Sequence, residues 1–123
     1  MATLTPKLTL SSTDVDPNNA LDLSVDDTLT TEDPSSMPSR ISVAHDAPTE
    51  IIAAAISAVN FVYIKNIGTN NSRTITVSTA GGTAFATLAI GEWMYLPIKA
   101  STGIEVQSTT SAEIVEYAYF TKS

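Results

Sequence analysis

The chain contains no cysteine and a single histidine, His45. Without cysteine it can form neither a disulfide nor a thiolate metal site. His45 precedes Asp46, but neighbouring residues of an extended strand point to opposite faces, and the chain has no nucleophile in a constrained turn such as G-x-S-x-G. We therefore expect His45 to be an ordinary residue at the end of a loop and not a catalytic base.

Basic residues are also few. Six lysines and arginines stand against 13 acids, for a formal net charge of −7. Nine of the acids lie in residues 1–58, where Lys7 and Arg40 are the only bases. Phosphate binding needs clustered lysine and arginine, so a nucleic-acid partner is not expected. A partner of the first half of the chain is expected to be basic or neutral.

Long apolar runs are missing as well. The first residues, MATLTPKLTL, contain no apolar stretch of signal-peptide length, and no segment approaches the length of a membrane span. We expect a protein that is made and used without Sec-type export and has no membrane partner.

The acidic residues form no catalytic or metal-binding pattern. Glu113 and Glu116 are three positions apart, so on a strand they face opposite sides and do not make the carboxylate pair of a glycosidase. Residues 14–22, DVDPNNALD, resemble the start of a calcium loop, but Asn19 and Val25 stand where such a loop needs glycine and glutamate. A glycine-rich phosphate loop is absent too. We expect no enzymatic activity, no metal and no cofactor.

What the sequence does contain is alternation of apolar and polar residues with the period of a β-strand. Hydrophobic residues make up 43% of the chain, which is a globular composition. Residues 60–67, NFVYIKNI, are apolar on both faces and predict a central strand, and Gly81 and Gly82 predict a hairpin turn. The spacing of strands and turns predicts an all-β protein, an antiparallel β-sandwich that is jelly-roll-like or immunoglobulin-like.

The N-terminal third has a different organisation. Two similar segments, LTLSSTD at 8–14 and LDLSVDD at 21–27, flank the turn-forming DVDPNN and predict an antiparallel pair. Residues 30–40, TTEDPSSMPSR, carry two prolines and predict a linker or long loop. We therefore divide the chain into an extended N-terminal arm or hairpin, 1–38, and a β-sandwich domain, 39–123. The apolar residues of the arm are candidate assembly contacts: Leu8, Leu10, Leu21, Leu23 and Val25.

Residues 49–58 are ambiguous. Their apolar residues, together with Val59, fall at helical spacing, but the flanking segments are strand-like. The pattern favours a strand followed by a turn, with a short helix as the alternative.

Aromatic residues cluster in the strand-like segments of the second half. The only tryptophan, Trp93, shares one strand face with Tyr95, and the other face of that strand is also apolar. A strand that is apolar on both faces is usually buried, in a core or in a subunit contact, so we expect Trp93 to be buried. The alternative is an exposed platform for a sugar. The candidate core aromatics are Phe61, Tyr63, Trp93, Tyr95 and Tyr117.

Four stretches together resemble small virion structural proteins of tailed bacteriophages, notably those that infect marine cyanobacteria. They are MATLTPKLTLSSTD at the start, FVYIKNIGTNN, LAIGEWMYLPI, and GIEVQS with EIVEYAYFTK at the end; the resemblance is weakest over 30–58. It implies a non-enzymatic virion component, foremost a capsid decoration or cement protein, assembled in the host cytoplasm. It also implies the major capsid protein or other virion subunits as partners. We further expect symmetric self-association, of which a trimer is one form.

Two other functions remain open from the sequence. One is a tail, neck or fibre-associated structural protein that uses the same β-domain in a ring. The other is a glycan- or receptor-binding β-sandwich that uses Trp93, Tyr95 and surface acids on an exposed face.

Overall fold

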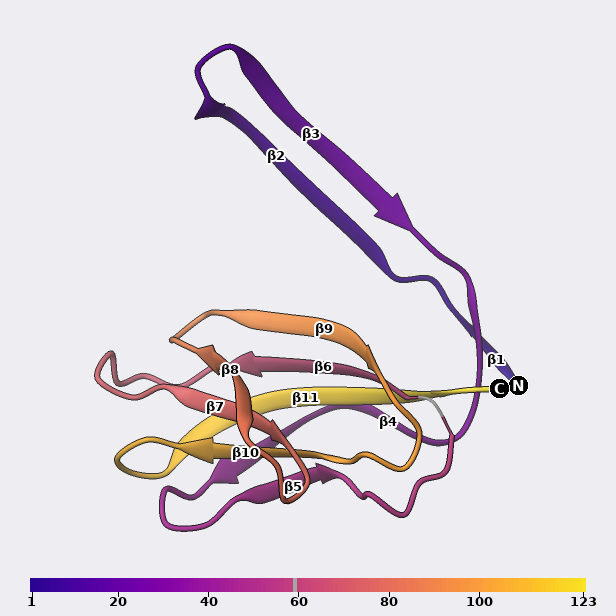
Figure 1. The fold of residues 1–123 in the computed structure, drawn as a ribbon, viewed down its shortest axis with the longest axis vertical. Helices are drawn as coiled ribbons and strands as arrows, with labels where there is room; N and C mark the ends of the chain where they lie inside the picture. The colour runs from indigo at the N-terminus through magenta and orange to yellow at the C-terminus, as the bar shows by residue number, and fades with distance from the viewer. Residues whose placement is uncertain (59) are drawn as a thin grey trace.

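The computed structural model describes residues 1–58 and 60–123. Over these residues the protein is all-β, every strand pairing is antiparallel and no helix occurs (Figure 1). The strands are β1 (Ala2–Leu4), β2 (Lys7–Asp16), β3 (Asn19–Asp26), β4 (Leu29–Val43), β5 (Thr49–Ile52), β6 (Asn60–Asn66), β7 (Ile75–Thr79), β8 (Ala84–Leu88), β9 (Trp93–Ile98), β10 (Ile104–Ser108) and β11 (Glu113–Lys122). The described residues include no helix long and apolar enough to cross a membrane.

Two sheets enclose one core and together form a curled half-barrel. The first has five strands in the order β1-β4-β11-β6-β9, and the second has four in the order β5-β10-β7-β8. Both sheets contribute fully buried aliphatic side chains to a single cluster. Its members include Val43, Ile52, Val62, Ile64, Ile75, Val77, Ile104, Val106 and Val115.

Strand β6 shows how the alternation of side chains builds this core. Val62 and Ile64 point inward and are completely buried, whereas Phe61, Tyr63 and Lys65 lie on the outer face and are half-buried. The strand pairs with β11 on one side and β9 on the other. The prediction of a central strand at this position is confirmed.

Strand β4 corrects the prediction for residues 30–40. The linker or long loop expected there is wrong, because these residues continue one strand from Leu29 to Val43. Strand β1 pairs only with residues 29–31, so beyond Thr31 one side of β4 is an open edge, where proline is tolerated. On the β11 side the register shifts twice between Tyr117 and Thr121. The boundary expected at residue 38 therefore falls inside this strand.

Side-chain hydrogen bonds replace the missing ladder bonds near Pro34. The Thr121 backbone N–H donates to Ser35 Oγ at 3.3 Å, and the Thr121 hydroxyl lies against the Pro34 carbonyl. The same hydroxyl donates to Asn60 Oδ1 at 2.8 Å. Thr121 thus joins β4, β11 and β6 in the region where the prolines interrupt regular pairing.

Residues 49–52 form strand β5, and turns follow up to residue 58. The favoured interpretation of this segment, a strand followed by a turn, is confirmed. Val59, which contributed to the alternative helical spacing, lies outside the described residues.

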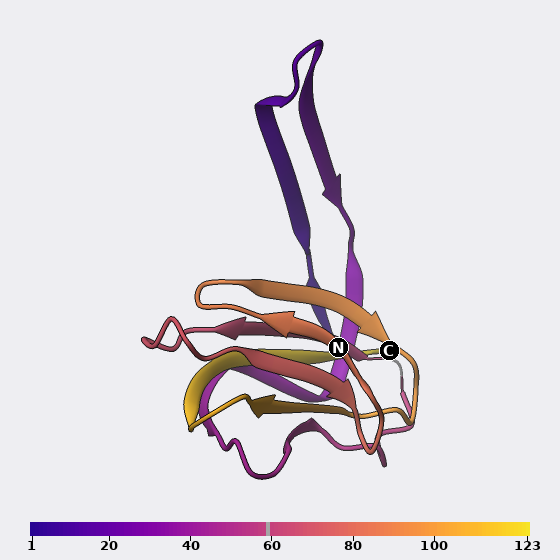
Figure 2. The same ribbon diagram turned by 60° about the vertical axis from the view of Figure 1, so that its left-hand side comes forward.

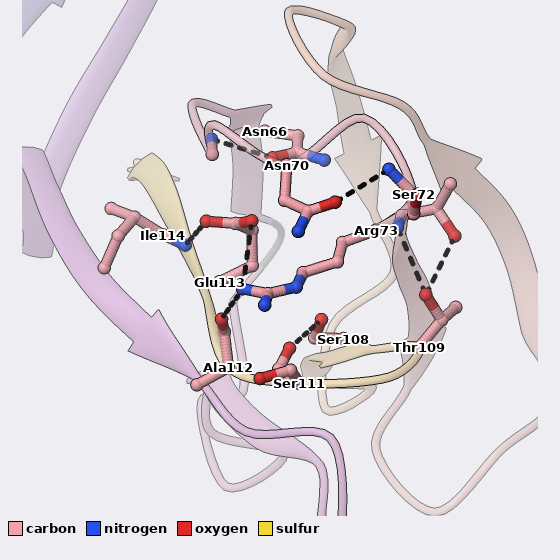
Figure 3. A network of polar contacts seen from close by, with 12 residues as sticks. Asn66, Asn70, Ser72, Arg73, Ser108, Thr109, Ser111, Ala112, Glu113 and Ile114 are labelled. Atoms are coloured by element: carbon pink, nitrogen blue, oxygen red, sulfur yellow. Dashed lines mark hydrogen bonds and ion pairs between the residues drawn. The ribbon is translucent and has the colours of Figure 1, made fainter.

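A polar network closes one end of the half-barrel (Figure 3). Arg73 Nη1 donates to the Ala112 carbonyl at 3.0 Å and lies 3.7 Å from the buried carboxylate of Glu113. That carboxylate also accepts the Ile114 backbone N–H at 3.1 Å. Gly68 packs directly against the Glu113 side chain, which fills the space where a Cβ atom would stand. These contacts hold the β6–β7 and β10–β11 connections together.

Strands β2 and β3 pair only with each other and extend away from both sheets, as Figures 1 and 2 show. The antiparallel pairing expected between 8–14 and 21–27 is confirmed. At the base, the Asp27 backbone N–H donates to the Pro6 carbonyl at 3.1 Å, so the two strands leave the body of the molecule side by side. We call residues 7–26 the hairpin.

Candidate functional site

Five of the six large apolar residues of the hairpin lie at paired positions on one face; the sixth, Val15, lies near the tip. Leu8 pairs with Val25, Leu10 with Leu23, and Ser12 with Leu21. Because directly paired residues of an antiparallel ladder lie on the same face, these side chains form one row. We call Leu8, Leu10, Leu21, Leu23 and Val25 the leucine stripe; their side chains are 38–52% exposed. The candidate assembly contacts are therefore brought together, and nothing in the described residues covers them.

The opposite face of the hairpin is polar. Lys7 pairs with Asp26, Thr9 with Ser24, and Ser11 with Asp22. Lys7, Asp22 and Asp26 thus lie on the face opposite the leucine stripe.

The tip of the hairpin is held by aspartate turn chemistry. Asp16 Oδ1 accepts the Asn18 backbone N–H at 2.9 Å, and Asp16 Oδ2 accepts from the Asn19 side chain at 3.1 Å. The first of these bonds is the main reason that the pKa of Asp16 is lowered. The segment that resembles the start of a calcium loop thus uses its central carboxylate to shape a turn.

The second part of the site is the outer face of the five-stranded sheet below the hairpin. We call its rings the aromatic face: Phe61, Tyr63, Trp93, Tyr95 and Phe120. They come from β6, β9 and β11, whose outward positions align across the ladder. Phe61 and Tyr95 are stacked, with ring centroids 5.9 Å apart and planes inclined by 22°.

A groove of about 460 Å³ lies between the aromatic face and the base of the hairpin. Its hairpin wall comes from Pro6, Lys7, Leu8, Val25, Asp26 and Asp27, with Leu4 beside them. Leu8 and Val25 belong both to this wall and to the leucine stripe. The groove and the stripe are therefore one continuous apolar surface.

Two tyrosine hydroxyls in the groove have different surroundings. Tyr63 donates to Glu116 Oε1 at 3.1 Å, and burial, followed by this bond and the Glu116 charge, raises the pKa of Tyr63. The Tyr95 hydroxyl is buried and has no hydrogen-bond partner among the described residues. Burial, followed by the nearby charge of Asp27, raises the pKa of Tyr95. Both phenols are thus kept in their neutral form.

The expectation that Trp93 is buried is wrong for the single chain, because its side chain is 52% exposed. The predicted division of faces is correct, since Trp93 and Tyr95 line the outer groove while Met94 and Leu96 pack against the core. Trp93 is exposed because β9 is the last strand of its sheet and the outer face at this end has no cover.

The other candidate core aromatics divide between the two faces. Tyr117 packs against the core, as expected, whereas Phe61, Tyr63 and Tyr95 are half-buried on the outer face. Phe120 was missed as a groove residue. Its position two residues after Ala118, in the alternation of β11, is the signal that could have identified it.

The remaining candidate polar residues do not converge. Glu113 lies on the inner face of β11 and Glu116 on the outer face, as their spacing predicts. His45 is exposed in the connection after β4, and its carbonyl accepts from the Gln107 side chain at 2.7 Å.

Comparisons with protein-family models, curated proteins and solved structures found no match to this chain. The site consists of an apolar stripe joined to an aromatic groove, with Asp26 and Asp27 among the residues that line it.

Proposed function

We propose that this chain is a non-enzymatic virion structural protein that binds neighbouring subunits through the hairpin, most specifically a capsid decoration or cement protein of a tailed bacteriophage. The observation that carries the proposal is the uncovered leucine stripe on a hairpin that extends away from its own sheets. The resemblance to phage virion proteins supports the virion as the location. A tail, neck or fibre-associated position uses the same surface and remains the alternative location.

In this proposal the two sheets form a β-sandwich and the hairpin serves as its N-terminal arm. A lone two-stranded hairpin is marginally stable in water. Covering the exposed half of each side chain of the leucine stripe on a neighbour contributes about 1 kcal/mol per residue. The contact of one copy is modest, but many copies on a shell add their contributions.

The test removes the hairpin without disturbing the sheets. Lys7 and Asp26 are paired, so a variant that joins them through Asn-Gly closes the chain with a two-residue turn. We expect this variant to keep the circular dichroism spectrum of the β-fold and to lose co-sedimentation with undecorated phage heads. A folded variant that binds heads as tightly as the full chain would exclude this role of the hairpin.

A second function, a glycan- or receptor-binding module, is favoured by one observation. Trp93 is half exposed on an outer sheet face, and Asp26 and Asp27 line the same groove. Rings that stack on a sugar and carboxylates that accept its hydroxyls are a common combination for carbohydrate binding. Screening wild type and Trp93→Ala on a glycan array separates the two functions. Specific binding that depends on Trp93 would support the module, and its absence together with head binding would support decoration.

A further inference from the structure

We propose that the leucine stripe is covered by the leucine stripe of a second copy of this chain, the two hairpins packing face to face and antiparallel about a two-fold axis. The axis passes near the Leu10–Leu23 pair, so that the tip of each hairpin reaches the aromatic groove of the other copy. This inference rests on the proposed function, because it identifies a second copy of the chain as the subunit that the leucine stripe binds.

The distribution of charge on the hairpin favours a second copy as the occupant. The chain has a formal net charge of −7, so two copies repel each other wherever their acids meet. In the paired region Asp22 and Asp26 lie on the face opposite the stripe. Contact between two stripes therefore buries mainly apolar and hydroxyl side chains and leaves Asp22 in water, while Asp26 borders the groove beside Lys7. A basic partner, by contrast, would be attracted to the polar face and would leave the stripe exposed.

The size of the surface argues that the contact extends beyond the stripe. The eight residues of β3 span about 27 Å, so one face of the hairpin buries only a few hundred Å². A stable interface buries about 800 Å² on each partner. The groove continues the stripe at its base, and Val15, 73% exposed, is a further apolar side chain near the tip. A contact that includes the tip and the groove approaches the required area.

Antiparallel packing brings these two extensions together. With the Leu10–Leu23 pairs opposite each other, the Ser12–Leu21 pair of one copy lies opposite the Leu8–Val25 pair of the other. The tip that follows then lies against the partner's groove. In each copy, the partner's stripe thus covers the stripe and the partner's tip covers the groove. The same surface is used by both copies, as in an isologous dimer.

The acids of the tip favour the same direction. Parallel packing would bring Asp14 and Asp16 of both tips together. Antiparallel packing places them at a base where Lys7 lies beside Asp26 and Asp27. Repulsion between the tips is thereby avoided.

The first experiment measures the mass of the full chain in solution by light scattering. We expect wild type at twice the 13.0 kDa of a single chain. Leu23→Asp puts a charge into the stripe and should give the single-chain mass at the same concentration. Ser24→Asp puts the same charge on the polar face one residue away and should remain a dimer. A wild type that is monomeric at every concentration, a trimer or larger ring, or equal dissociation of both variants would overturn the inference.

The second experiment measures the direction of packing and does not depend on a variant of the stripe. Because the chain has no cysteine, Asn18→Cys places a single spin label at the tip. Asn18 lies five residues before Leu23 along the shorter strand of the hairpin, which is about 17 Å, so antiparallel hairpins put the two labels roughly 30–40 Å apart. A distance below about 20 Å, which parallel packing requires, would contradict the proposed arrangement.

Binding to undecorated heads separates this inference from the proposed function. If wild type is monomeric in solution and the stripe variant loses head binding, the second copy is wrong and the stripe instead meets the shell. If the stripe variant becomes monomeric but still binds heads like wild type, the second copy is supported and the proposed role of the hairpin in head binding fails.

Discussion

Tyr63 and Tyr95 are directly paired across β6 and β9 on the same outer face, yet only one of their hydroxyls has a hydrogen-bond partner within residues 1–58 and 60–123. Tyr63 donates to Glu116 at 3.1 Å, whereas the Tyr95 hydroxyl is buried without a partner among the described residues. Two chemically identical groups, one strand apart, therefore contribute to stability with opposite signs.

Removal of each hydroxyl tests this difference. Tyr63→Phe should lower the free energy of unfolding by about 0.5–1.5 kcal/mol, because it removes a hydrogen bond and leaves Glu116 without its donor. Tyr95→Phe should raise it by about 1 kcal/mol, because it removes a buried polar group that has no partner. Urea denaturation of both variants measures the two changes. A loss of stability in Tyr95→Phe would show that its hydroxyl does have a partner.

The same tyrosines predict the response to alkaline pH. Burial raises the pKa of both Tyr63 and Tyr95, so the folded chain holds these protons at a pH where the unfolded chain has released them. Their contribution is fully present below the unfolded pKa of about 10 and is lost as the pH rises from there through the folded pKa. We expect wild type to lose more stability between about pH 8 and pH 11 than the double phenylalanine variant does. An equal fall in the free energy of unfolding with pH in the two proteins would contradict this account.

Trp93 should matter little to the stability of the single chain. Its side chain is 52% exposed, so Trp93→Ala should change the free energy of unfolding by no more than about 1 kcal/mol, well below the roughly 3–5 kcal/mol of a core aromatic. Ile64→Ala, at a fully buried position, is the matched comparison and should cost about 2–5 kcal/mol. Both are measured by denaturation at low protein concentration. A similar cost for both would mean that Trp93 is part of the core.

Gly68 should tolerate no side chain. A Cβ atom at this position occupies the space of the Glu113 side chain, which is buried and lies 3.7 Å from Arg73. Gly68→Ala should therefore cost about 1–3 kcal/mol through overpacking and displacement of the carboxylate. In a Glu113→Ala background the added cost should be much smaller, because the space is then free. Equal costs in the two backgrounds would mean that the glycine is needed for its backbone and not for this contact.

Much of the strand content could be predicted from alternation alone. Residues 60–66 show an inward and an outward set of side chains, and 93–98 divide into the two faces that the structure has. The pairing of β2 with β3 could be predicted from the turn residues between them. Asp16, Asn18 and Asn19 hydrogen-bond locally and need no distant partner. Local chemistry decides these features, so a single sequence contains them.

The exposure of Trp93 and the course of β4 could not be predicted in this way. Whether a two-faced apolar strand is covered depends on its place in the sheet, and β9 is an edge strand only because of long-range pairing. Likewise, Pro34 and Pro38 fit within β4 because β1 ends at Leu4 and leaves that side open. The groove combines residues from five segments of the chain, which no local pattern brings together.

The hairpin is inserted between β1 and β4, so its length can change without a change in the two sheets. The Pro6–Asp27 hydrogen bond fixes both strands at the base, so residues added beyond it leave the registers of the two sheets untouched. Side chains alternate with a period of two, so each insertion of two residues per strand keeps the leucines on the same face and lengthens the hairpin by about 7 Å. The reach of the hairpin can therefore be changed in regular steps while the two sheets keep their structure.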